Sequence, residues 1–181
     1  RRNAYARRDA NYKTIIEVAR RLQSDKDIVF QMIGDGPSKE QFIAEAKVKG
    51  LANIEFYPLQ PIPIVPDVYS ACDVCIIPLK KGVIGNGTPS KAPILMACRR
   101  IILNCVESWS KYSKMFDVYD MGYAVDVDDY EGIVASIIKI KMNPEDTKQK
   151  IENAYRYGRE HFSSTRSTRI LMEVMERYRK R

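Results

Sequence analysis

The chain has 181 residues, 45% of them hydrophobic, and its 30 Lys and Arg against 23 Asp and Glu give a formal net charge of +7. This length corresponds to one domain with a sizeable core, and no apolar run is long enough to cross a bilayer. The charge fits a phosphate-bearing ligand, nucleic acid, an anionic membrane face or simply a solubilising surface. Nucleic acid is disfavoured, because the chain lacks a basic recognition helix with interleaved aromatic residues.

Helices and short apolar strands alternate along the chain. A helix is expected first, over residues 12–22, where Ile15, Ile16, Ala19 and Leu22 share one face. Strands are expected over residues 27–33, 53–57, 74–77, 101–103 and 122–125. Because these strands are continuous apolar runs, the pattern predicts an α/β fold with a doubly wound parallel sheet, followed by a helical C-terminal tail.

Several helix boundaries have their own signals. Pro37 suits the first turn of the helix after the first strand, and Gly50 is expected to end that helix. Asn143 and Pro144 predict the N-cap and first turn of a later helix. The last helix, after residue 164, gathers apolar residues on one side: Ile170, Leu171, Val174, Met175 and Tyr178.

Four cysteines occur, at positions 72, 75, 98 and 105. Cys72 and Cys75 have the CxxC spacing of zinc and redox sites, but His161 is the only histidine and lies far along the chain. Buried free thiols are the favoured interpretation. Together with the lack of an apolar core in residues 1–13, they predict a reduced, cytoplasmic location, free or peripheral at the inner face of a membrane.

Parallel sheets bind ligands at the carboxyl ends of their strands, which here places residues 34–37, 57–60 and 79–91 at the site. In the last of these loops, Thr88 is expected to cap a helix that begins at Pro89. The N–H groups of Ser90 and Lys91 then carry the positive end of the helix dipole.

The side chains and glycines of this corner add to its suitability for an anion. The Ser90 hydroxyl and the Lys91 ammonium are further donors, and Gly85 and Gly87 allow a ligand to approach the backbone closely. The corner therefore predicts a diphosphate site. A well-capped helix with a solvated lysine is the alternative, and the loop at residues 34–37 could likewise be an ordinary turn between strand and helix.

The order and spacing of these pieces resemble the second half of the family 4 (group 1) glycosyltransferases of the GT-B type. The matching pieces are Gly34-Asp35-Gly36-Pro37, Gly50-Leu51-Ala52-Asn53-Ile54-Glu55-Phe56, Ala71-Cys72-Asp73-Val74 leading to Pro78, and Pro89-Ser90-Lys91 with Met96-Ala97-Cys98. The resemblance covers nearly the whole chain from Tyr12 onward. Pro-Ser-Lys followed by Met-Ala-Cys is similar to a subgroup that builds bacterial surface polysaccharides.

The resemblance implies one half of a retaining glycosyltransferase. Residues 1–181 would form a single Rossmann-like domain, its first strand missing, that binds a UDP- or GDP-linked sugar without a metal. An N-terminal domain of the same longer protein would bind a glycan or lipid-linked acceptor, so the chain alone is expected to be inactive. The last helix of such enzymes often returns to that first domain, so its apolar side could be exposed here and drive self-association.

The resemblance also implies which residues contact the donor. The diphosphate would lie over Gly87 and residues 88–91, and the nucleoside near a second set of residues: Gly34, Asp35, Gly36, Leu59 and Gln60. Three basic residues fall near the place of the family's arginine and lysine on the diphosphate: Arg7, Arg8 and Lys13. A solvated basic end is the alternative interpretation of these three residues.

The sequence departs from the family pattern after the corner. Ile94 stands where an acid is expected to bind the ribose, and Asn86 replaces a second acid eight residues earlier. A Gly-Lys-Pro sequence is replaced by Arg99-Arg100-Ile101, and Pro93 is expected to kink or delay the helix. A plain core residue is the alternative for Ile94. These departures motivate a second hypothesis, a degenerate, non-catalytic GT-B-like module with a role in assembly or regulation.

Overall fold

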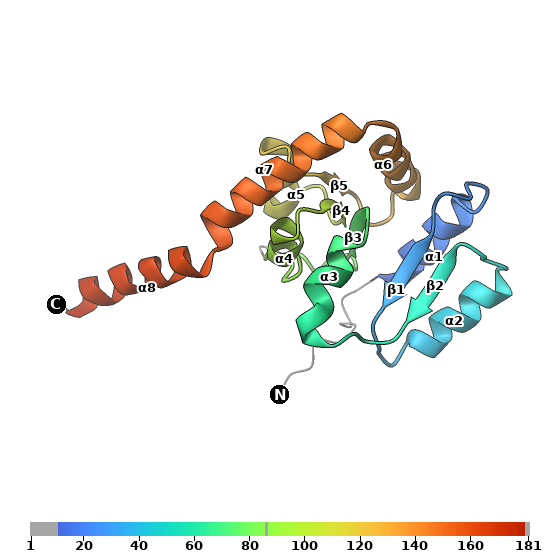
Figure 1. Ribbon diagram of the computed structural model, residues 1–181, viewed down its shortest axis with the longest axis horizontal. Helices are drawn as coiled ribbons and strands as arrows, with labels where there is room; N and C mark the ends of the chain where they lie inside the picture. The colour runs from blue at the N-terminus through green and yellow to red at the C-terminus, as the bar shows by residue number, and fades with distance from the viewer. Residues whose placement is uncertain (1–10, 86, 180–181) are drawn as a thin grey trace.

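The structure of the protein is a computed structural model that describes residues 11–85 and 87–179 (Figure 1). Three of the candidate site residues named above, Arg7, Arg8 and Asn86, lie outside the described residues. In chain order the elements are α1 (Tyr12–Arg21), β1 (Phe30–Ile33), α2 (Lys39–Val48), β2 (Ile54–Tyr57), the 3-10 helix η1 (Ile62–Ile64), α3 (Val65–Ser70), β3 (Val74–Pro78), α4 (Ala92–Ala97), β4 (Ile101–Cys105), α5 (Lys111–Val118), β5 (Tyr123–Val125), α6 (Tyr130–Met142), α7 (Pro144–Phe162) and α8 (Ser164–Arg179).

The strands form two parallel ladders. β1 pairs with β2 in one ladder, and β4 lies between β3 and β5 in the other. Within residues 11–85 and 87–179, no pairing joins the two ladders. The predicted parallel α/β architecture with a helical C-terminal region is confirmed, with the strands divided between two ladders.

Helices cover both faces of the β3–β4–β5 ladder, because successive residues of β4 point to opposite sides. Leu103 and Cys105 belong to a core cluster with residues of α1 and α6, among them Ile16 and Ile133. Ile102 belongs to a second cluster with residues of α4, α5 and α7. Burial on both faces explains why β4 begins with an apolar run over residues 101–103, and Asn104 is its one polar residue.

Gly122 lies directly before β5, where the chain passes close to β4. Its φ is +147°, and an added Cβ would lie 2.5 Å from the backbone oxygen of Ile102 and 3.3 Å from Cε1 of Phe116. Glycine is therefore required here both by the backbone conformation and by the lack of space.

Most predicted helix boundaries are confirmed. The predicted face of α1 is buried, and Gly50, at a φ of +64°, follows the end of α2. Pro144 lies in the first turn of α7. The position of Pro37 was predicted wrongly, because α2 begins at Lys39 and Pro37 lies in the turn before it.

Helix α5 was not predicted from the sequence. Its N-cap is Ser110, whose Oγ accepts a hydrogen bond from the N–H of Ser113 at 3.1 Å. Tyr112 and Phe116, one helical turn apart, are buried on its inner face. A serine cap followed by this spacing is the local signal that could have identified the helix.

Helix α8 extends away from the rest of the molecule (Figure 1). None of its residues within 164–179 is buried, and its apolar side chains are exposed, from 42% for Val174 to 72% for Tyr178. Among the described residues, no helix is both long and apolar enough to span a membrane.

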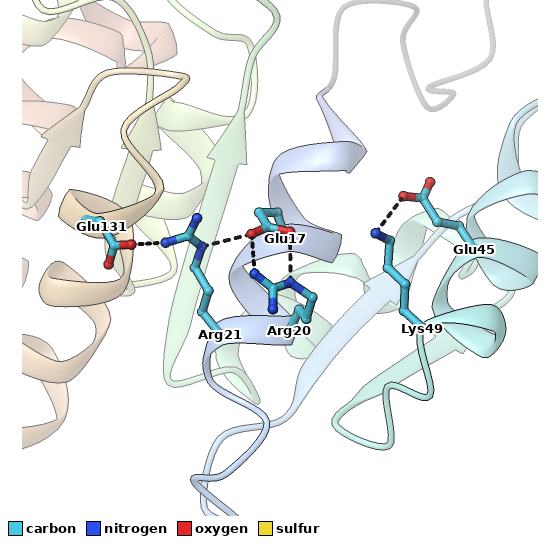
Figure 2. A network of polar contacts seen from close by, with 6 residues as sticks. All are labelled: Glu17, Arg20, Arg21, Glu45, Lys49 and Glu131. Carbon is cyan, nitrogen blue, oxygen red and sulfur yellow. Dashed lines mark hydrogen bonds and ion pairs between the residues drawn. The ribbon is translucent and has the colours of Figure 1, made fainter.

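Ion pairs connect α1 with α6 beside the first core cluster (Figure 2). Glu17 binds Arg20 at 2.8 Å and Arg21 at 2.9 Å, and Arg21 also pairs with Glu131 of α6. The hydrogen bonds and charges of Arg20 and Arg21 lower the pKa of Glu17 to about 2. Glu17 is thus the carboxylate at the centre of this network.

We expect Glu17→Gln to reduce the free energy of unfolding at pH 7 by about 1 kcal/mol or less, since solvent screens the pair. The folded-state pKa lies below the ordinary value of 4.5, so the stabilisation is complete above that pH and is lost as the pH falls toward 2. Urea unfolding of both proteins from pH 7 to pH 2 measures this. Glu45→Gln is the control, because Glu45 pairs with Lys49 alone in Figure 2, at 3.8 Å. A difference between Glu17→Gln and the original protein that persists at pH 2 contradicts the prediction.

Candidate functional site

The carboxyl ends of β3 and β5 meet the beginning of α1. The N–H of Asn11 donates to the carbonyl of Pro78 at 2.7 Å, and the Thr14 hydroxyl donates to the carbonyl of Val127 at 3.4 Å. Lys13 lies between them in the chain, in the first turn of α1, and is exposed. The structure therefore places Lys13 at the strand ends where ligands of parallel sheets bind.

Asp35 joins the loops that follow β1 and β2. Its Oδ2 accepts a hydrogen bond from the N–H of Leu59 at 3.0 Å, and its Oδ1 pairs with Lys39 Nζ at 2.8 Å. The hydrogen bond from Lys39, with that from Leu59, lowers the pKa of Asp35. The candidate residues at 34–36 and 59–60 thus lie together, and Asp35 is an ionised carboxylate at neutral pH.

Lys39 is a residue of this site that the sequence analysis missed. Besides Asp35, its Nζ donates to the carbonyl of Tyr57 at 3.1 Å, and the N–H of Gly34 donates to the same carbonyl at 3.2 Å. The side chain of Gln60 donates to the carbonyl of Pro58 at 2.9 Å. The spacing of four between Asp35 and Lys39 was the available signal.

The loop between β3 and α4 is connected to the ends of β4 and β5. Lys81 pairs with Asp128 at 3.2 Å, and the N–H of Gly82 donates to the carboxylate of Glu107. Ile84, 5% exposed, packs into the second core cluster. Glu107 was also missed in the sequence, because its partner lies 25 residues away.

The predicted cap of α4 is wrong. The helix begins at Ala92, so Thr88 is not its N-cap, and the N–H of Ala92 donates to the carbonyl of Pro89 at 3.0 Å in a preceding turn. Pro93 explains the delay, because in a helix begun at Pro89 its ring would clash with the carbonyl four residues earlier. The helix dipole therefore begins three residues later than predicted.

The corner itself lies on the surface of the molecule. Four of its five candidate residues are exposed and Pro89 is half-buried; the exposed ones are Gly87, Thr88, Ser90 and Lys91. Hydroxyl and ammonium donors are thus accessible at the carboxyl end of β3, next to the first turn of α4. These groups can donate to a phosphate even though the helix begins later.

Ile94 is not the core residue that the alternative interpretation expected. It is 37% exposed, whereas its neighbours Leu95 and Met96 are buried. The position therefore does face away from the core, and it presents an apolar side chain where the family pattern has an acid.

Arg99 occupies a left-handed backbone conformation, with a φ of 51°, in place of the family's glycine. This conformation costs a residue other than glycine about 1–2 kcal/mol. The guanidinium lies 3.9 Å from the centroid of the Tyr155 ring and pairs with Glu152, and both partners belong to α7. These side-chain contacts offset the backbone strain and connect the end of α4 to α7.

The four cysteines are free thiols, as predicted, but Cys72 and Cys98 are half-buried rather than buried. Burial raises the pKa of Cys75 and of Cys105 to about 12, so these two are neutral thiols at physiological pH. In the part of the chain that the structure describes, no group of three His, Cys, Asp or Glu side chains is placed to hold a metal ion.

Comparisons with known proteins identify relatives. The family model described as "Glycosyl transferases group 1" matches residues 4–157. WcaI of Escherichia coli (strain K12), assigned as a glycosyl transferase of colanic acid biosynthesis, is 25% identical over 133 residues, which are 73% of the chain and 32% of WcaI. WbjE of Pseudomonas aeruginosa, assigned as a glycosyltransferase, is 28% identical over 102 residues, which are 56% of the chain and 26% of WbjE. The chain thus spans a third or less of each relative.

A solved structure supports the fold. Anabaena Alr3699/HepE in complex with UDP matches 96% of this chain and 47% of its own, with a TM-score of 0.78 and 12% sequence identity. This similarity confirms the predicted fold, a Rossmann-like half of the GT-B type with a helical C-terminal region.

Proposed function

The chain belongs to the group 1 glycosyl transferases, and from this premise we propose that it is the donor-binding half of a retaining enzyme of family 4. The complete protein transfers a sugar from a UDP- or GDP-linked donor to a glycan or lipid-linked acceptor. The similarity to WcaI favours bacterial polysaccharide biosynthesis, at a cytoplasmic or peripheral membrane location.

The observation that carries this proposal is the exposed corner at the carboxyl end of β3. Ser90 and Lys91 offer hydroxyl and ammonium donors to the diphosphate. Negative charge develops on the diphosphate as its bond to the sugar breaks, and donors placed in advance stabilise that charge. In this proposal Lys91 performs the stabilisation without a metal ion.

The nucleoside lies near the two loops that Asp35 connects. Because Asp35 already binds Lys39 and the N–H of Leu59, its role is to hold these loops together rather than to contact the ligand. Ile94 packs against the nucleotide instead of accepting a hydrogen bond from the ribose, which an isoleucine cannot do.

A second candidate function is a non-catalytic module that retains the fold for assembly or regulation. The apolar side chain of Ile94 at an exposed position and the replacement of glycine by Arg99 favour it. In that case the fold is preserved and nucleotide binding is lost.

Calorimetric titration with UDP, GDP and their sugars distinguishes the two functions. Saturable binding of one nucleotide at micromolar concentration supports the donor-binding half. No binding by either nucleotide, in the chain and in a longer form that includes the acceptor-binding domain, supports the non-catalytic module. Sugar transfer by the 181-residue chain alone contradicts the proposed division into two halves.

We also propose that the acceptor-binding domain lies upstream in the same protein and covers α8. The supporting observation is the exposed apolar side of this helix, because large exposed apolar patches mark interaction surfaces. We propose that the same upstream segment also adds a strand to the sheet, because β1 and β3 each have an unpaired edge in the described ladders.

We expect the isolated chain to self-associate through α8. Leu171 and Met175, each 59% exposed and one turn apart, are replaced together with glutamate, which should leave a monomer in light scattering at high protein concentration. The control is Arg169→Glu. Arg169 is two positions from Leu171 and therefore lies on another side of the helix, so this variant should still associate. A strictly monomeric original chain contradicts this expectation.

A further inference from the structure

Glu107 is a buried carboxylate between β4 and α5. The residue is 2% exposed, and its backbone carbonyl accepts a hydrogen bond from the N–H of Ser110, the N-cap of α5, at 3.1 Å. A carboxylate is rarely buried unless it binds a partner, because removing its charge from water is costly. The contacts of this side chain therefore indicate what it does.

One carboxylate oxygen binds the loop that leads to the corner. Oε1 accepts a hydrogen bond from the N–H of Gly82. Oε2 is buried as well, and among residues 11–85 and 87–179 it has no hydrogen-bond donor. The side chain thus directs one oxygen at the loop.

Among the described residues, the other polar contacts of the turn that Glu107 binds are local or exposed. The N–H of Val83 donates to the carbonyl of Lys80 at 3.3 Å, and Gly82 has a φ of +81°, which closes a tight turn. Lys81 reaches Asp128 through an exposed ion pair, which contributes little in water. The hydrogen bond from Gly82 therefore ties this turn to a buried side chain, that of Glu107.

The turn at Gly82 also fixes the position of the corner at residues 87–91. Two residues after Gly82, Ile84 packs into the core, and its carbonyl accepts a hydrogen bond from the N–H of Gly87 at 2.9 Å. Gly87 directly precedes Thr88. A shift of Gly82 is thus transmitted through a short, connected segment to the residues that bind the diphosphate in the proposed function.

We propose that Glu107 is a positioning residue for the nucleotide site, acting through the N–H of Gly82. The length of the Glu107 side chain matters for this role and its charge does not, because the N–H of Gly82 needs only a hydrogen-bond acceptor at the right distance. This inference rests on the proposed function for the identity of the ligand, but the contact with Gly82 can be tested without any ligand.

Two variants separate length from charge. Glu107→Gln keeps the length and an acceptor oxygen, and Glu107→Asp keeps the charge but withdraws the carboxylate by one methylene. In Glu107→Asp we expect the exchange of the Gly82 amide with deuterium to rise at least about tenfold, and the Kd for UDP or GDP to rise about tenfold. In Glu107→Gln both values should stay within about threefold of the original protein.

The outcomes are distinguishable. Equal exchange of Gly82 in Glu107→Asp and the original protein, or a loss of affinity in Glu107→Gln as large as in Glu107→Asp, overturns the inference. Thermal unfolding of all three proteins identifies a variant that does not fold. In that case the amide exchange and the Kd of the other variant test the inference. If the original protein binds neither UDP nor GDP, the proposed function fails, and the exchange of Gly82 alone supports or overturns the role of Glu107.

Discussion

Replacing Lys91 with alanine should weaken the binding of UDP or GDP by about 10- to 100-fold. The reason is that a charge-assisted hydrogen bond to a phosphate contributes about 1.5–3 kcal/mol, and each 1.4 kcal/mol changes Kd by about tenfold. Lys91 is exposed at the corner, so the substitution leaves the buried core residues in place. Calorimetric titration of the variant and the original protein with the same nucleotide measures the loss.

Lys47→Ala is the matched control for Lys91→Ala. Lys47 is also exposed, but it lies in the last turn of α2. This turn leads to the amino end of β2, away from the carboxyl ends of the strands. Its loss should change Kd by less than about twofold, because solvent and salt screen a charge that far from the ligand. Equal affinity of Lys91→Ala and Lys47→Ala would remove Lys91 from the diphosphate site.

Gly122→Ala should reduce the free energy of unfolding by about 3 kcal/mol or more. The added Cβ would lie 2.5 Å from a backbone oxygen of the central strand, which cannot move without disturbing β4, and overpacking of a core typically costs about 1–3 kcal/mol before the strain of the positive φ is added. For a chain of this size, such a loss lowers Tm by roughly 6–12 °C. Circular dichroism during heating measures the shift.

Gly50→Ala separates the cost of the steric clash from the cost of the positive φ. Gly50 also has a positive φ, of +64°, but nothing lies within 4 Å of an added Cβ. Its substitution should cost only the backbone strain, about 1 kcal/mol. If both variants lose the same stability, the contact with Ile102 relaxes at no cost and the expected clash at Gly122 is refuted.

Burial on both faces is the reason that β4 could be predicted from the sequence. Each residue of β4 is buried, and the strand is recognisable by the apolar run over residues 101–103 that precedes the buried polar Asn104. Helix α5 was harder to predict, because Lys111, Ser113 and Asp117 interrupt its apolar residues and its inner face is narrow. Local patterns thus revealed the apolar run of β4 and the regular apolar face of α1, and they missed the interrupted pattern of α5.

The corner shows where local reasoning failed. Thr88 and Pro89 are suitable first residues of a helix, and the prediction that the helix begins there gave less weight to Pro93 than its ring requires. The sequence did indicate that Pro93 would kink or delay the helix. In the structure α4 is delayed and begins at Ala92. This delay changes which backbone groups belong to its first turn.

The connections among the site loops could not be predicted from local patterns. Gly82 and Glu107 are 25 residues apart, and Lys39 is 18 residues from the carbonyl of Tyr57 that it binds. Such pairs become neighbours only when parallel strands bring their carboxyl ends to one edge. The sequence placed the loops at that edge, but it gave no means of pairing their side chains.

Arg99 makes the effects of substitutions at three positions depend on one another. Glycine at position 99 relieves the left-handed backbone strain but loses the contacts with Glu152 and Tyr155, so its effect in the original protein is a small difference between opposing terms. Once Tyr155 is alanine, the same glycine becomes favourable. The end of α4 is therefore an epistatic site, where the effect of the family's glycine depends on which residues α7 carries.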